Sequence, residues 1–78
     1  MFWPMNKITY QLHVFDGETR AYTWEAMTPF VTIHKGELLK VPGWNKAATV
    51  TSVSHEFEEN THVGDGAHLI QRTIVRCN

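Results

Sequence analysis

The longest stretch of this sequence with the character of an extended strand is residues 46–57, KAATVTSVSHEF. Its valines and threonines branch at the β-carbon, and such side chains fit a pleated sheet better than they fit a helix. Successive side chains of a strand point to opposite faces, and here the apolar side chains change face between Val50 and Val53. We therefore expect either a β-bulge near Thr51-Ser52, which bends the strand across a small barrel, or a central strand covered on both faces.

The other strands are read from alternation and turn signals. Residues 7–15 alternate between apolar and polar side chains, which is typical of a strand with one buried face. Residues 19–26 alternate again after Asp16-Gly17, a strong turn signal, so the two segments predict a hairpin. The remaining strand segments are residues 30–34, which continue as residues 38–41 after a kink at Gly36, and residues 68–77.

Five strands joined by short turns predict an all-β domain. Trp24–Met27 allows at most one short helical turn, because Thr28-Pro29 would end it. We expect a small five-stranded antiparallel barrel or roll, for which the SH3-like and OB-like barrels are the closest familiar architectures. That likeness concerns the fold alone and implies no function. The 78 residues form one domain, 1–78, in which the acidic and glycine-rich segment 58–67 is expected to be a mobile loop.

The composition excludes several classes of protein. A hydrophobic content of 42% with 19% charged residues is typical of a globular chain. A net charge of -1 argues against a strong binder of polyanions. The single cysteine, Cys77, allows no internal disulfide and favours a reducing, cytoplasmic location. We expect neither a membrane span nor a secretory signal, because the apolar start of the chain is too short for either.

No pattern in the sequence predicts catalysis. Cys77 is the penultimate residue and lacks the rigid, desolvated setting that a nucleophile needs. His55, His62 and His68 surround the segment 58–67, but their spacing matches no compact zinc motif. We therefore expect no enzyme, no catalytic residues, no cofactor and no metal site, and we interpret these histidines as ordinary strand or surface residues.

The aromatic residues carry the functional prediction. Phe2, Trp3, Trp24 and Trp44 are more large aromatics than so small a core can easily enclose, and protein interfaces are enriched in such residues. We expect a non-catalytic module that acts by binding another macromolecule, most simply a protein. The predicted interaction surface comprises Phe2, Trp3, Met5 and Trp44.

The apolar N-terminal arm, residues 1–6, is the expected contact of a homodimer. A chain of this length buries only ~60% of its unfolded surface. Without a disulfide or a metal, self-association is the remaining route to stability. The alternative is that the arm folds back on its own barrel and stabilises a monomer by the same burial.

A second functional reading is a single-stranded nucleic-acid-binding barrel. Such barrels stack bases on aromatic rings and follow the phosphate backbone with cations. Lys35, Lys40, Trp44 and Lys46 cluster in the sequence and are the predicted contacts. Solvated edge lysines that prevent strands from aggregating explain the same residues, so protein binding is the preferred interpretation.

Overall fold

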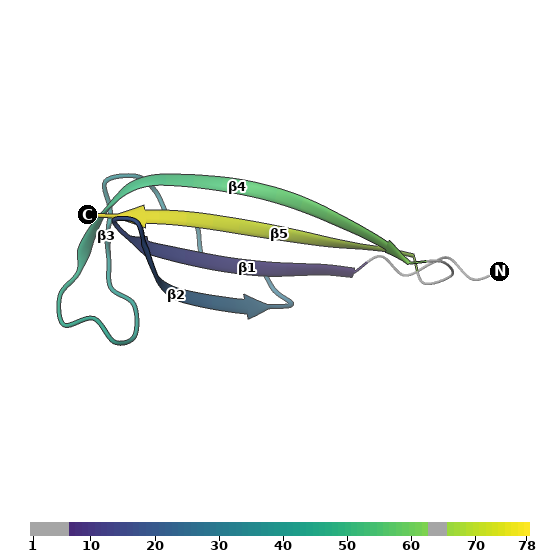
Figure 1. Ribbon diagram of the computed structural model, residues 1–78, viewed down its shortest axis with the longest axis horizontal. Coiled ribbons are helices and arrows are strands. Elements are labelled where there is room, and N and C mark those ends of the chain that lie inside the picture. Colours follow the sequence, from purple (N-terminus) through teal and green to yellow (C-terminus); the bar gives the residue numbers. More distant parts are fainter. Residues whose placement is uncertain (1–6, 63–65) are drawn as a thin grey trace.

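The computed structural model describes residues 7–62 and 66–78. All regular secondary structure in those ranges is β-strand. The strands are β1 (Lys7–Asp16), β2 (Thr19–Ala26), β3 (Leu38–Leu39), β4 (Ala48–His62) and β5 (Gly66–Cys77). They form one sheet in the order β2-β1-β5-β4-β3, which curls into a half-barrel (Figure 1). The prediction of an all-β, five-stranded small roll is confirmed.

One pairing differs from the antiparallel sheet that was expected. β1 and β5 run parallel, from Lys7 opposite His68 to Asp16 opposite Cys77, whereas the β1–β2, β3–β4 and β4–β5 pairs are antiparallel. The sheet is therefore mixed. Alternation within a strand shows which face is buried, but it carries no information about which neighbour the strand takes or in which direction that neighbour runs.

β4 contains the bulge that was one of the two alternatives for this strand. Val50 pairs with Cys77 and Ser52 pairs with Arg76, so Thr51 is the extra residue. Its hydroxyl donates a hydrogen bond to the Arg76 carbonyl oxygen at 3.1 Å. Because the bulge shifts the alternation by one residue, Val50 and Val53 both pack in the core on the concave inner face.

The segment 58–67 is strand over most of its length, which corrects the expected loop. Glu58 pairs with Ile70 and His62 pairs with Gly66, so β4 and β5 form one long hairpin. Acidic residues and glycines are poor strand formers by themselves, but here residues 58–62 each have a partner on β5. Residues 63–65 and the N-terminal arm 1–6 lie outside the described residues.

The predicted third strand is reduced to two residues. Leu38 and Leu39 pair with Thr49 and Ala48, and residues 30–34 are irregular. The kink predicted at Gly36 is present, with a φ of 91°, a backbone conformation that favours glycine. The Gly36 N–H donates to the Val50 carbonyl at 2.8 Å, which joins the kink to the start of β4.

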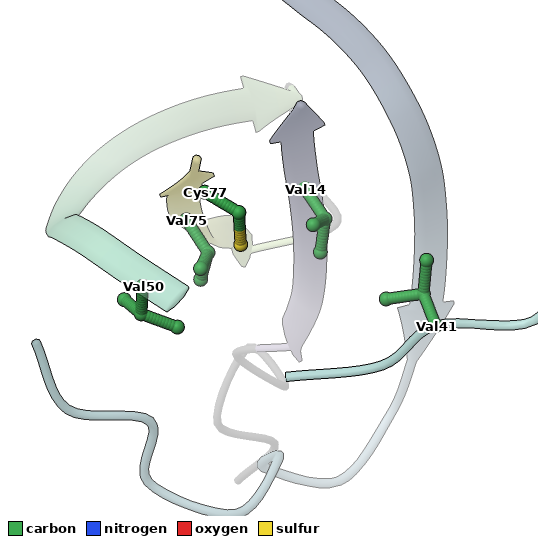
Figure 2. Close-up of a cluster of buried hydrophobic side chains, with 5 residues drawn as sticks. All are labelled: Val14, Val41, Val50, Val75 and Cys77. Carbon is green, nitrogen blue, oxygen red and sulfur yellow. The ribbon is translucent and has the colours of Figure 1, made fainter. Parts of the chain in front are cut away.

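The core occupies one end of the inner face. Its buried residues are Val14, Val41, Val50, Val75 and Cys77 (Figure 2). The parallel register sets Val14 directly opposite Val75, so the two central strands meet through these side chains. Seven half-buried residues surround them: Leu12, Tyr22, Ile33, Leu39, Trp44, Ala48 and Val53.

Replacing Val75 with alanine should destabilise the protein strongly. Val75 is fully buried, so the change removes apolar contact and leaves a cavity, at a cost of about 2 kcal/mol in the free energy of unfolding. Val31 is 85% exposed, and Val31→Ala is the matched control with an expected change within about 0.5 kcal/mol. Urea denaturation followed by tryptophan fluorescence measures both, and equal losses would contradict this placement of the core.

Candidate functional site

β4 is an edge strand over most of its length. β3 pairs only with Ala48 and Thr49, and backbone hydrogen bonds to residues 36 and 37 extend this coverage to Val50. From Thr51 to His62, no described residue forms a strand pair with the outer side of β4, which is the upper border of the sheet in Figure 1. The unpaired N–H and C=O groups of such an edge are a template for another strand.

The two edges of the sheet differ in how well they resist pairing. On β2, Ala21 is an extra residue at a bulge, and a bulge disrupts the ladder that an incoming strand needs. On β4 the pairing with β5 is continuous from Ser52 to His62, and residues 51–62 contain neither lysine nor proline. β4 is therefore the more receptive edge.

A groove of about 510 Å³ lies along the first part of the β4 edge, and we call it the edge groove. Its lining residues are Thr32, Ile33, His34 and Lys35 on one side and Thr51, Ser52, Val53 and His55 on the other. The first wall is held by Glu37, whose carboxylate accepts a hydrogen bond from the His34 backbone N–H at 2.8 Å. The Val50 N–H also donates to the Glu37 carbonyl at 2.8 Å, which fixes the distance between wall and strand.

A second groove, of about 290 Å³, lies on the inner face, and we call it the inner groove. Its lining residues are Tyr10, Leu12, Pro29, Phe30, Val31, Thr32, Ile33, His55, Gln71 and Thr73. It shares Thr32, Ile33 and His55 with the edge groove, so the two are contiguous. The connection between β2 and β3 crosses the inner face here and forms one wall (Figure 1).

The inner groove combines an apolar lining with a few polar groups, as is usual for binding sites. Leu12 and Ile33 pack against the core at its base. The His55 Nδ1 and the Thr73 hydroxyl lie 3.2 Å apart, a hydrogen bond that fixes the orientation of the imidazole.

Exposed apolar side chains continue the inner face beyond the core. Phe57 on β4 is 64% exposed and Ile8 on β1 is 40% exposed. Trp24 on β2 is 55% exposed and stacks on Tyr22, with ring centroids 6.4 Å apart and planes within 5°. Large apolar side chains exposed on one face of a small protein make that face a candidate interaction surface.

The opposite face of the sheet carries a charged cluster around Arg72. Its Nη1 and Nη2 donate to the carboxylates of Glu56 and Glu58 at 3.3 Å each, and its Nε donates to the Gln11 side-chain oxygen at 3.1 Å. One guanidinium therefore joins β1, β5 and β4. Beside it, burial, with the charges of Arg72 and Arg20, lowers the pKa of His13.

The predicted nucleic-acid contacts are divided between different parts of the surface. Trp44 and Lys46 line one open hollow of about 390 Å³, together with Asp16. Lys35 lines the edge groove instead, and Lys40 lines neither. Trp44 is half-buried against the core rather than fully exposed.

The rest of the predicted interaction surface, Phe2, Trp3 and Met5, lies outside the described residues. The edge groove was not predicted from the sequence. Residues 46–57 were interpreted as either a central strand or a bent strand, and neither interpretation included an unpaired edge. The signal that was present is the absence of lysine and proline from residues 51–62.

Neither a metal centre nor a membrane-crossing helix is found in the described part of the chain. No three His, Cys, Asp or Glu side chains gather there in a way that would hold a metal ion. Residues 7–62 and 66–78 include no helix long and apolar enough to cross a bilayer.

Comparisons with models of known protein families, with curated proteins and with solved structures found no match to this chain. Function is therefore inferred from the surface of the protein itself.

His13 should make stability depend on pH. Because its pKa is lowered by burial and by the nearby arginines, the unfolded chain takes up a proton at a higher pH than the folded protein does. The free energy of unfolding should therefore fall as the pH drops below about 6.5. His13→Gln should lose less stability over the same range. Urea denaturation of both proteins at about pH 7.5 and about pH 5 measures this, and identical pH dependence would contradict it.

Proposed function

We propose that this protein is a non-catalytic β module that binds another protein chain by accepting an extended segment as an additional strand beside β4. The observation that carries the proposal is the outer edge of β4 from Thr51 to His62, with which no described residue forms a strand pair. In strand addition, main-chain hydrogen bonds supply affinity, and pockets for alternate side chains supply specificity.

The two grooves supply such pockets. Side chains of an added strand alternate between the faces of the sheet. Those on the inner face meet His55 and the exposed ring of Phe57, next to the inner groove. Those on the other face lie beside Ser52, Ser54, Glu56 and Glu58. A bound segment should therefore carry apolar residues at alternate positions.

The proposal of a non-catalytic role is supported by the placement of the perturbed ionisable groups. Shifted pKa values tend to gather at active sites. Among the described residues, Cys77 and His13 both lie outside the two grooves, and His13 lines a separate hollow of about 520 Å³. Burial raises the pKa of the Cys77 thiol, which keeps it protonated and unreactive. We also propose a cytoplasmic location, because a free, buried cysteine fits a reducing compartment.

A peptide selected from a random display library should bind along β4. Hydrogen–deuterium exchange should then slow at the amides of residues 51–59 and stay unchanged in β2. Phe57→Ser should weaken the peptide's affinity about tenfold, because the ring loses ~1.5 kcal/mol of burial. Leu38→Ser is the matched control, since Leu38 is also largely exposed, at 72%, but lines neither groove. Protection at β2, or a monomeric protein for which no peptide can be selected, would contradict the proposal.

A second candidate function is binding of single-stranded nucleic acid. It is favoured by a hollow that brings an aromatic ring, Trp44, together with a cation, Lys46. Asp16 lines the same hollow and opposes a phosphate, so this candidate stands behind protein binding.

Lys46→Glu should abolish any such binding. A labelled single-stranded oligonucleotide would be titrated at about 50 mM and about 200 mM salt, where phosphate contacts weaken with rising salt. Lys35→Glu is the control, because Lys35 lines a different groove. Absence of binding at the lower salt would exclude this function.

A further inference from the structure

We infer that the strand added beside β4 is the β4 strand of a second copy of this chain, paired antiparallel around a two-fold axis at His55. This inference rests on the proposed function, in that it names the occupant of the same free edge. The axis stands perpendicular to the sheet, so the inner faces of the two copies lie on the same side.

Symmetry leaves few registers to consider. A two-fold axis perpendicular to an antiparallel pair places one residue directly opposite its own copy, and that residue defines the whole register. The edge available for pairing begins at Thr51, because the backbone of Val50 is already bonded to residues 36 and 37. A register centred on Ser54 brings residue 58 against Val50 and so shortens the ladder.

The positions of the glutamates select among the remaining registers. If the two-fold axis passes through Glu56, that carboxylate lies opposite its own copy. If the axis passes through Phe57, Glu56 of each copy lies opposite Glu58 of the other. Like charges directly opposite each other destabilise a strand pair. Centring on His55 avoids every such contact. The opposed pairs are then Val53 with Phe57, Ser54 with Glu56, Ser52 with Glu58 and Thr51 with Glu59.

The edge groove adds charge complementarity to this register. His34 and Lys35 form one wall of the groove opposite Thr51 and Ser52. In the His55-centred pair, these are the positions where Glu59 and Glu58 of the second copy lie. The Glu37 carboxylate accepts a hydrogen bond from the His34 backbone N–H and does not line the groove. Lys35 of each copy therefore lies near Glu58 and Glu59 of the other copy, and the two-fold axis repeats this attraction.

The same register covers exposed apolar surface. Phe57 is 64% exposed, and its partner across the axis is Val53, which is half-buried at the margin of the core. Aromatic and β-branched residues form favourable cross-strand pairs. At the axis itself His55 meets its own copy, where one imidazole can donate a hydrogen bond to the other.

Charge substitutions at Ser54 test the pairing, because this exposed residue faces Glu56 of the second copy and the two-fold axis repeats the contact. Sedimentation equilibrium at micromolar concentrations should show a dimer. Ser54→Glu should weaken dimerisation about tenfold and Ser54→Lys should strengthen it about tenfold. Thr19→Glu and Thr19→Lys, on the exposed β2 edge, are matched controls expected to change nothing. Circular dichroism would confirm that each variant folds. Misfolding could weaken the dimer but could not strengthen it, so the gain expected for Ser54→Lys is a test that misfolding cannot mimic.

Cysteine cross-linking tests the register. In the His55→Cys variant, the introduced cysteines of the two copies lie opposite each other at a Cα–Cα distance that suits a disulfide. This variant should form a covalent dimer on mild oxidation. Ser52→Cys lies opposite residue 58 instead and should not cross-link. The native Cys77 is buried and should stay reduced.

Four results would overturn the inference. A monomeric protein whose β4 amides are protected by a selected peptide would refute the second copy but leave the proposed function standing. A monomer that binds no peptide would refute both. A dimer insensitive to both Ser54 variants, or one cross-linked through Ser52→Cys rather than His55→Cys, would refute the register. A dimer that disappears when residues 1–5 are removed, while Ser54→Glu has no effect, would assign the contact to the N-terminal arm.

Discussion

The parallel pairing of β1 with β5 is the constraint on which the rest of the structure depends. It sets Val14 against Val75 at the centre of the core and brings Asp16 level with Cys77 at the end of the sheet. It also occupies one side of β5, so β4 takes the other side and stands near the border. Because β3 is only two residues long, the remaining edge of β4 has no strand beside it within the described chain. The free edge is thus a consequence of how the central strands pair.

The bulge at Thr51 divides β4 into two parts with different roles. Before it, Val50 is buried and its backbone is tied to residues 36 and 37. After it, the strand leaves the core and runs on beside β5 alone, with the ring of Phe57 exposed. A hairpin that extends beyond its core has little buried apolar surface to hold it. The Arg72 cluster compensates in part, since one guanidinium joins β4 to β5 and β1.

The sequence predicted those features that depend on residues close together along the chain. The alternation in residues 7–15 and 19–26 and the Asp16-Gly17 turn predicted the first hairpin, which is present as β1 and β2. The kink at Gly36 was equally local. The parallel pairing of β1 with β5 was not predictable, because it joins segments that are distant in the sequence, and no local pattern encodes the partner.

The same distinction explains where the structure of these segments differs from what was expected. The composition of residues 58–67 favours a loop, but a partner strand on β5 overrides that preference, as often happens for β-structure. Trp44 was assigned to the predicted interaction surface, and in the structure it packs half-buried against the core formed by distant strands. The free edge itself emerges only from the order of strands in the sheet, although the lack of lysine and proline in residues 51–62 was visible.

The glutamates of β4 bear on what kind of assembly this edge permits. Stacking many copies parallel and in register would set Glu56, Glu58 and Glu59 each against its own copy at every step, and such contacts oppose growth. An antiparallel pair around His55 sets each of them against a hydroxyl instead, and it occupies the β4 edge of both copies at once. That assembly is closed, because the edge that remains, β2, carries a bulge that discourages further pairing. The acidic stretch therefore disfavours an open fibre while it permits a dimer.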